Sequence, residues 1–286
     1  MKQFIKKLFI KWGIWSPLRR LYKRLFANKG TLPGKYAQVH EWRLPADGID
    51  LRFDLRDDYS KRWFLPRYDA GRIHEPVVTN LFMELIDKKD TVLDIGAHLG
   101  YFTCLAGVLA KNGQVHAFEV DPKCMGLIEK NVEKNSLSNV FTNNMAVSDH
   151  VGSEKLVLKS NPNPSLRLLD VEGAVEVPAI TIDAYLAERG ITPHFVKVDV
   201  EGAEFKVLKG MEKTLRKNRF VMLIEIHIAE LNTFFGVDYK EIISFLIDCG
   251  FQLKKINEHR SLESRFEPIG THSELHGNTM LFCEKS

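Results

Sequence analysis

The sequence predicts an α/β fold of the Rossmann-like kind, with a mostly parallel sheet and helices on both of its faces. From residue 91 onward, apolar runs of strand length alternate with segments in which apolar residues recur at helical spacing. The strand-like runs are 91–95, 114–120, 140–147, 195–200 and 220–226, and the helix-like segments are 101–111, 122–135, 182–189, 203–217 and 239–249. Such alternation is typical of parallel strands joined by crossover helices.

The segments around this alternation predict additions to the sheet. A helix over residues 75–86 precedes the first strand, and two further strands, 252–257 and 279–284, follow the last helix. The long excursion between those two strands carries turn residues, so we expect an antiparallel edge pair. Two strand-like runs, 154–159 and 175–181, interrupt the alternation and predict an inserted hairpin near the ligand face.

The chain is expected to have three parts, residues 1–30, 31–72 and 73–286, of which the last holds the α/β domain. Residues 1–30 carry nine Lys/Arg and no acid, with apolar side chains on one helical face. This pattern predicts a basic amphipathic arm on an anionic membrane surface; the alternative is a helix packed on the protein itself or on a partner subunit. Residues 31–72 predict a small hairpin (38–44 and 49–55) and then a charged, aromatic loop at 57–72.

Composition limits the classes of function. Nine of the 40 basic residues lie in the arm, so the rest of the chain has 31 basic against 37 acidic residues and is not expected to bind nucleic acid. No run of 18 apolar residues predicts a spanning helix. The four cysteines lie far apart without zinc-site spacing, which predicts reduced thiols in a cytoplasmic protein.

The first predicted strand ends in Asp94 and leads through Gly96-Ala-His-Leu-Gly100 into a helix. The glycines allow a sharp turn and the close approach of a ligand, and amides at a helix N-terminus suit a carboxylate or a phosphate. A nicotinamide dinucleotide would require Gly-x-Gly-x-x-Gly, and the middle glycine is missing here. The turn therefore disfavours a nicotinamide dehydrogenase.

Nearly every predicted strand is followed by a carboxylate, and the carboxyl ends of parallel strands meet at one edge of the sheet. These acids are Asp94, Glu119, Asp149, Asp199 with Glu201, and Glu225. Such an edge suits a cationic, polyhydroxylated ligand, and S-adenosyl-L-methionine has an ammonium, a ribose diol, an adenine and a sulfonium but no phosphate. Asp94 would hold the ammonium, the loop amides the carboxylate, Glu119 the ribose hydroxyls and Asp149 the adenine amino group. The predicted donor-binding residues are Asp94, Gly96, His98, Gly100, Glu119, Val120, Ala146, Val147, Asp149 and Asp199.

Several stretches together resemble the FkbM family of S-adenosylmethionine-dependent methyltransferases. They include Val92-Leu-Asp-Ile-Gly-Ala-His-Leu-Gly-Tyr101, Val196-Lys-Val-Asp-Val-Glu-Gly-Ala-Glu204 and Ile224-Glu-Ile-His227. The resemblance covers residues 70–284 and implies a class I methyltransferase: a seven-stranded sheet with an antiparallel last strand, and O-methylation of a hydroxyl, often on a sugar or a secondary metabolite. His98 stands where the family often has Asn, and Val120 where it often has Pro.

Methyl transfer to a hydroxyl requires alignment of the acceptor oxygen behind the methyl, and a weak nucleophile benefits from a base or a metal. We expect Asp199 to lie beside the methyl group and the acceptor, with His227 or Glu201 accepting the proton. A divalent metal held by Asp199, Glu201 and His227 is the alternative, and the sequence assigns no metal site.

The sequence thus predicts an S-adenosylmethionine-dependent enzyme that methylates a hydroxyl of a carbohydrate, glycolipid or secondary-metabolite acceptor. The alternatives are an N-methyltransferase acting on a small molecule or a protein, and a non-catalytic S-adenosylmethionine-binding protein. We expect a cytoplasmic protein that is peripheral at the membrane, with a small-molecule or glycan acceptor. The loops at 57–72, 150–175 and 258–278 are expected to form the acceptor pocket, with Trp63, Tyr68, His272 and His276 as candidate contacts.

Overall fold

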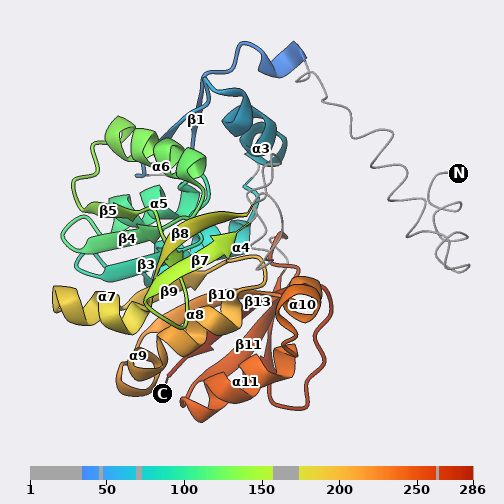
Figure 1. The fold of residues 1–286 in the computed structure, drawn as a ribbon. Helices are drawn as coiled ribbons and strands as arrows, with labels where there is room; N and C mark the ends of the chain where they lie inside the picture. The colour runs from blue at the N-terminus through green and yellow to red at the C-terminus, as the bar shows by residue number, and fades with distance from the viewer. Residues whose placement is uncertain (1–33, 45–47, 69–72, 157–173, 262–263, 286) are drawn as a thin grey trace, which may run out of the picture. The chain divides into compact units, whose positions relative to one another are not determined.

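The computed structural model describes residues 34–44, 48–68, 73–156, 174–261 and 264–285 (Figure 1). The chain divides into two compact units, Met1–His40 and Glu41–Ser286. Of the first unit, only residues 34–40 are described, with a short 3-10 helix η1 at Gly34–Tyr36. The predicted basic arm therefore lies outside the described residues.

The second unit is built around an eight-stranded sheet with the order β12-β11-β13-β10-β9-β3-β4-β5 among the described residues (Figure 1). Five neighbouring strands are parallel, and β13 is antiparallel to β10. The strands are β3 (Thr91–Ile95), β4 (Gln114–Phe118), β5 (Val140–Asn143), β9 (Phe195–Val198), β10 (Val221–His227), β11 (Gln252–Asn257), β12 (Arg265–Ile269) and β13 (Asn278–Glu284). The predicted mostly parallel sheet with an antiparallel last strand is confirmed, and this strand order is that of a class I methyltransferase.

Strand β12 adds an eighth strand that the sequence analysis did not predict. It returns along the open edge of β11, in antiparallel register from Asn257↔Arg265 to Leu253↔Ile269. Its residues are mostly exposed, and Pro268 removes one amide hydrogen, which an edge strand tolerates. Because β12 is exposed on both of its faces, no alternation of buried apolar residues revealed it.

Helices cover both faces of this sheet. From β3 the chain adds strands in one direction along the sheet, to β4 and β5. From β9 it adds β10 in the opposite direction. Because the crossovers are right-handed, the helices of these two halves lie on opposite faces of the sheet. The first set contains α4 (Pro76–Leu85), α5 (Tyr101–Leu109) and α6 (Pro122–Lys134); the second contains α7 (Ile182–Arg189), α8 (Glu204–Gly210), α9 (Glu212–Lys217) and α11 (Tyr239–Asp248). The main core lies between the second set and strands β3, β9 and β10.

One predicted helix, 203–217, is divided in the structure into α8 and α9. The break falls at Met211, whose side chain is fully buried in the main core. At the preceding Gly210, a Cβ atom would lie 1.9 Å from the carbonyl oxygen of Ser148. The backbone there packs directly on the segment after β5, so the helix bends to keep this contact.

After β10, a short helix α10 (Ile228–Glu230) and a π-helical turn η3 (Leu231–Phe235) precede α11.

The prediction of a loop at 57–72 is wrong, because Asp58–Tyr68 forms helix α3. Its buried residues Phe64, Leu65 and Tyr68 recur at helical spacing, which the charged residues between them concealed. Phe64 and Tyr68 pack on Trp42 of the hairpin, and their ring centroids lie 5.0 and 5.2 Å from the Trp42 centroid, respectively. This hairpin, β1 (Glu41–Arg43) and β2 (Arg52–Asp54), is antiparallel as the turn signals predicted.

The inserted hairpin is also present. Strands β7 (Gly152–Leu156) and β8 (Val175–Ile180) pair in antiparallel fashion, and β6 (Ala146–Val147) joins β8 to complete a three-stranded sheet. The predicted strand 140–147 therefore ends at Asn143, and its last residues belong to this second sheet.

No helix within the described residues combines the length and the hydropathy needed to cross a bilayer.

Candidate active site

Asp94 lies at the carboxyl end of β3, and its side chain is buried. The hydroxyl of Thr103 donates a hydrogen bond to Oδ2 over 2.6 Å, whereas Oδ1 has no hydrogen-bond partner among the residues the structure describes. Burial raises the pKa of this carboxyl, and the nearby Lys197 ammonium acts against that shift. An unpaired buried carboxylate oxygen is costly, so Oδ1 is a ready acceptor for a cationic ligand.

The turn after β3 brings the two central strands together. Gly96 has φ 85°, and a Cβ atom at this position would lie 1.9 Å from the carbonyl oxygen of Asp199. The turn backbone therefore packs directly on the end of β9, which only glycine permits. Gly100, with φ 79°, precedes α5, and His98 has φ 53°. The predicted donor turn and Asp199 are thus neighbours.

Glu119 follows β4 and is held by backbone amides on both oxygens. The amide of His98 donates to Oε2 over 2.7 Å, and the amide of Asp121 donates to Oε1 over 2.9 Å. Burial raises the pKa of Glu119 to about 7, although these amides act in the opposite direction. Each carboxylate oxygen keeps a second lone pair, so the pair of oxygens can still accept two hydroxyl hydrogens.

The ring of His98 contacts α3. The hydroxyl of Tyr59 lies 3.1 Å from Nε2, and the ring of Trp63 meets the His98 ring edge-on with centroids 4.5 Å apart. Helix α3 therefore lies beside the donor turn. Trp63 was a candidate acceptor contact, and the structure places it against His98; Tyr68 is buried in the aromatic cluster of the hairpin.

The residues expected around an adenine lie after β4 and β5. Ala146 and Val147 are buried in β6, and the Val147 side chain packs in the main core. The backbone carbonyl of Val120 accepts a hydrogen bond from the side-chain amide of Asn144 (Nδ2) over 3.2 Å. Asp149 is partly exposed and lies 2.9 Å from His150 Nδ1 and 3.9 Å from Lys206 Nζ. The Asp149 carboxylate is therefore accessible to a ligand.

His227 ends β10 inside a group of carboxylates. Its Nδ1 donates to Glu204 Oε1 over 2.7 Å, and its Nε2 lies 3.8 Å from Asp199 Oδ1 and from Glu201 Oε2. Burial opposes the charge of the ring, but the Glu204 hydrogen bond and the surrounding carboxylates raise the pKa of His227 to about 10. The structure thus brings together the three residues predicted to be catalytic, and it surrounds the imidazole with acceptors.

Lys197 is a residue of this site to which the sequence analysis gave no role. Its ammonium donates to Asp199 Oδ2 over 3.0 Å, its side chain is 3% exposed, and in the sheet it stands opposite Asp94. Burial acts against ionisation of Asp199, yet Lys197 and His227 lower the pKa of that carboxyl to about 2. A lysine within the apolar run Phe195-Val-Lys-Val198 was the available signal, because such a residue requires a buried anion.

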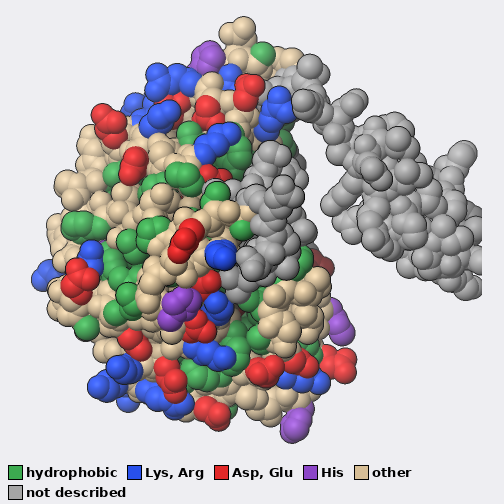
Figure 2. Space-filling model, viewed as in Figure 1, with side chains coloured by type: hydrophobic (Ala, Val, Ile, Leu, Met, Phe, Trp, Pro, Cys, Tyr) green, Lys and Arg blue, Asp and Glu red, His purple; other side chains and the backbone are tan. Residues whose placement is uncertain are grey.

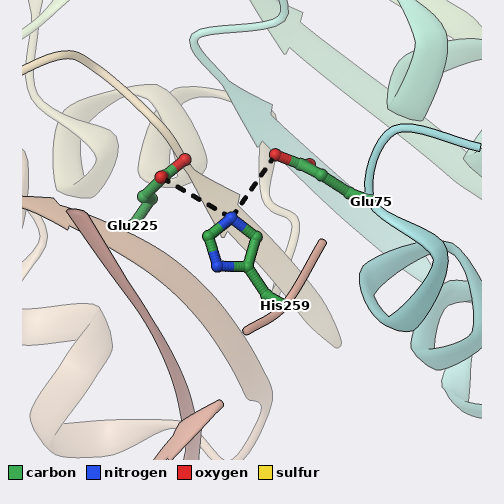
Figure 3. A group of neighbouring side chains, drawn as sticks. All are labelled: Glu75, Glu225 and His259. Carbon is green, nitrogen blue, oxygen red and sulfur yellow. Dashed lines mark ion pairs between the residues drawn. The ribbon is translucent and has the colours of Figure 1, made fainter. Parts of the chain in front are cut away.

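A second polar group lies on the other side of Glu225 (Figure 3). His259, which follows β11, has its Nε2 3.7 Å from Glu225 Oε1 and 3.8 Å from Glu75 Oε1. All three side chains are buried. Burial raises the pKa of Glu225 to about 8, and burial together with Arg260 lowers the pKa of His259 to about 4. Sequence spacing could not indicate this group, because the residue before α4, strand β10 and the segment after β11 each supply one member.

On the outer surface, acidic and basic side chains are interspersed over the described part of the face shown in Figure 2. The charges that define the site are therefore largely the buried ones. The sheet order, the glycine turn and the acids that follow β3, β4 and β9 define a class I, S-adenosylmethionine-dependent methyltransferase.

Comparison with known families agrees. Residues 94–253 match the model of the methyltransferase FkbM domain, and the chain belongs to this family. It is accordingly a methyltransferase enzyme with S-adenosyl-L-methionine as its cofactor. The residues present fit this donor, because Asp94 Oδ1 lacks a partner within the described chain and each oxygen of Glu119 keeps a lone pair for a ribose hydroxyl.

Two curated relatives are similar over part of the chain. The hexuronic acid methyltransferase AglP of Haloferax volcanii is 29% identical over 191 residues, which span 64% of this chain and 73% of the relative. The 31-O-demethyl-FK506 methyltransferase FkbM of Streptomyces tacrolimicus is 27% identical over 156 residues, 43% of this chain and 60% of the relative. Among solved structures, the methyltransferase FkbM from Methylobacillus flagellatus aligns with a TM-score of 0.47 at 14% identity, over 80% of this chain and 56% of that one.

Proposed function

We propose that this enzyme transfers the methyl group of S-adenosylmethionine to a hydroxyl of a carbohydrate acceptor. The observation that carries the proposal is the position of Asp199 and Glu201. Both carboxylates are partly exposed, at 24% and 31%, and both follow β9 where the donor turn packs on it. A hydroxyl must lose a proton as it is methylated, whereas Asp94, Glu119 and Glu225 are buried and Asp149 lies in the segment assigned to the adenine.

The donor would be held by residues on the β3, β4 and β5 side of the sheet. Asp94 Oδ1 accepts from the donor's ammonium. The turn amides expected for its carboxylate are largely engaged, because those of Gly96 and Ala97 donate to the Phe118 carbonyl and that of His98 donates to Glu119. Glu119 accepts from both ribose hydroxyls, and Asp149 from the adenine amino group. Bound in this way, the donor supplies an electrophilic methyl on a sulfonium.

On the acceptor side, the hydroxyl oxygen forms a bond to the methyl carbon as the carbon–sulfur bond breaks. The hydroxyl proton passes to a carboxylate, and we assign Glu201 as its acceptor. Burial raises the pKa of Glu201, which favours proton uptake. His227 is less suited, because both of its ring nitrogens already face carboxylates. His227 is instead a positioning residue that holds Asp199 and Glu201 by its charge.

A cavity of about 330 Å³ supports a sugar as the acceptor. It lies where β11 ends and β13 begins, and it is lined by Lys255, Arg260, His276 and Asn278 among others. Its volume is at the small end of the range for ligand pockets. Its walls are polar, with Lys255 and Arg260 alongside Glu258 and Glu274, and they suit a hydroxylated acceptor. AglP is by name a methyltransferase of a hexuronic acid, which makes acidic sugars the first acceptors to test.

The test is methyl transfer from labelled S-adenosylmethionine to acidic glycans and to fractionated cell extract, with the product identified by mass and by the site of methylation. We expect label on a sugar oxygen and a loss of turnover of about 10²-fold or more for Glu201→Gln. The matched control is Glu212→Gln on α9, which should keep full turnover. Label on a nitrogen would make the enzyme an N-methyltransferase, and donor binding without transfer would indicate a non-catalytic protein.

A further inference from the structure

We propose that Glu75, Glu225 and His259 form a binding site for a divalent transition-metal ion, with Zn²⁺ and Mn²⁺ as the ions that its donor set fits best. The site is defined by this buried trio alone, so it does not depend on the acceptor proposed above. One ligand comes from the residue before α4, one from β10 and one from the segment after β11 (Figure 3).

The distances suit coordination. His259 Nε2 lies 3.8 Å from Glu75 Oε1 and 3.7 Å from Glu225 Oε1, and the three ligand atoms all lie within 4.8 Å of one another. Donor atoms about 2.1 Å from a tetrahedral ion are about 3.4 Å apart. Shifts of a few tenths of an ångström would bring His259 to both carboxylates at this spacing, and the two carboxylate oxygens would have to approach each other by at most about 1.4 Å. At the present separations the imidazole is too far from either carboxylate for a hydrogen bond.

His259 supplies the observation that points to a ligand. Its Nε2 is buried and has no hydrogen-bond partner among the described residues, although it faces two carboxylates. A buried imidazole nitrogen without a partner is costly, and an ion would satisfy it. Burial and the Arg260 charge also keep the pKa of this ring low, so the imidazole is neutral, as metal binding requires.

The charge balance agrees with a cation. Glu75 and Glu225 are both buried, with side chains 7% and 3% exposed. Arg260 Nη2 lies 3.4 Å from Glu225 Oε1, and the Lys197 charge also acts on Glu75. The charged His227 ring lies 4.0 Å from Glu225 Oε2 as a third cation, and burial nevertheless raises the pKa of both carboxyls. A divalent ion would stabilise both ionised carboxylates.

The donor set narrows the ion. Imidazole suits zinc and other transition metals, and carboxylates suit manganese as well, whereas magnesium and calcium prefer oxygen donors alone. Three protein ligands leave a coordination position for water or for an oxygen of a ligand. His259 and Arg260 also line the cavity of about 330 Å³, which gives an ion a path from solvent.

The Asp199, Glu201 and His227 group is less suited to an ion. Its ligand atoms are equally close, but the His227 ring is already the cation of that group and donates to Glu204. The two groups meet at Glu225, whose Oε2 lies 4.0 Å from His227 Nε2. A test must therefore distinguish the two positions.

The test is calorimetric titration of the full chain, freed of metal with a chelator, with ZnCl₂ and with MnCl₂ alone. We expect one ion per chain, and a loss of affinity of at least about tenfold for His259→Gln and for Glu75→Gln. The matched control is His276→Gln, because His276 lines the same cavity but is 86% exposed; its affinity for the ion should stay unchanged. Affinity for S-adenosylmethionine reports whether each variant is folded.

A second measurement does not depend on variants. Crystals of the unmodified protein soaked in MnCl₂ should show an anomalous peak within bonding distance of Glu75, Glu225 and His259. The proposal is overturned if no ion binds, if the peak lies on Asp199, Glu201 and His227, or if folded His259→Gln and Glu75→Gln bind the ion as tightly as the unmodified chain.

Discussion

At the scale of single residues, Glu119 is an acid of the proposed donor site whose ionisation falls near neutral pH. Burial raises its pKa to about 7, while two backbone amides limit the shift. Below pH 7 the carboxyl is therefore largely protonated in the free protein, and above it the carboxylate can accept from both ribose hydroxyls. Binding of a ribose should consequently strengthen as the pH rises through 7.

Binding of adenosine tests this pH dependence, because adenosine has the ribose but lacks the ammonium and the carboxylate of the donor's methionine part. We expect its affinity to increase about tenfold between pH 6 and pH 8, since each unit below the pKa removes most of the ionised form. Glu119→Gln should bind adenosine more weakly and with little dependence on pH over this range. Asp94→Asn is the matched control, because adenosine has no ammonium for Asp94 to hold, and its pH profile should follow that of the unmodified protein. A flat profile in the unmodified protein would exclude this role for Glu119.

The sequence identified residues that local chain geometry brings together. Asp94 and Glu119 each end a strand of a parallel sheet, so their arrival at one edge follows from the alternation alone. Lys197 was partly predictable. A charged residue in a buried strand requires a partner of opposite charge, but the sequence does not indicate which residue that partner is. Glu75 and His259 meet only through the tertiary fold, and no periodicity encodes that contact.

At the scale of elements, the contact between the β3 turn and the end of β9 joins the donor half of the site to the acceptor half. It depends on Gly96, where a Cβ atom would lie 1.9 Å from the Asp199 carbonyl oxygen and where φ is 85°. Gly96→Ala would have to move this backbone apart and adopt a conformation that L-residues avoid.

We expect Gly96→Ala to lower the free energy of unfolding by about 2 kcal/mol or more and to abolish measurable donor binding. Denaturant unfolding and calorimetry with S-adenosylmethionine measure the two effects. Gly126→Ala is the matched control: Gly126 lies in α6, a Cβ there meets no described atom within 4 Å, and helix propensity predicts a gain of about 1 kcal/mol. Equal stability of the two variants would contradict the close approach.

The elements themselves were predictable where one face is buried and regular. The parallel strands and the helices between them follow from their apolar periodicity, with ends shifted by a few residues. Two elements were not predictable for opposite reasons. Charged residues surround the buried stripe of α3, and β12 has almost no buried face. The break between α8 and α9 depends on a backbone contact with Ser148, which lies far away in the sequence.

At the scale of the whole molecule, the order of strands explains why the site forms where it does. The chain winds in one direction from β3 through β5 and in the other from β9 through β10, so β3 and β9 are neighbours whose helices lie on opposite faces. A crevice opens at such a point beyond the carboxyl ends of the strands. Asp94 and Asp199 stand on its two sides, and the residues that we propose for donor binding and for proton uptake all lie in one unit, Glu41–Ser286.

This division leads to a prediction for residues 1–30, for which we propose membrane binding. The segment has nine Lys/Arg and no acid, and each basic residue near an anionic leaflet contributes about 1 kcal/mol. The full chain should co-float with vesicles that contain phosphatidylserine, and less so at high salt because surface charges are then screened. A chain that starts at Glu41 should keep its affinity for S-adenosylmethionine, since the residues assigned to the donor lie in that unit, but should remain with the soluble fraction.

The control for charge is a full-length variant in which Arg19, Arg20, Lys23 and Arg24 are replaced by Gln. Because these residues alternate with apolar ones, the replacement keeps the apolar side chains and removes four of the nine charges. Its vesicle binding should fall between that of the full chain and that of the shortened one, whereas binding to neutral vesicles should be weak for all three. If the chain that starts at Glu41 floats as well as the full chain, the membrane contact belongs to the folded unit, and the proposal for the arm is wrong.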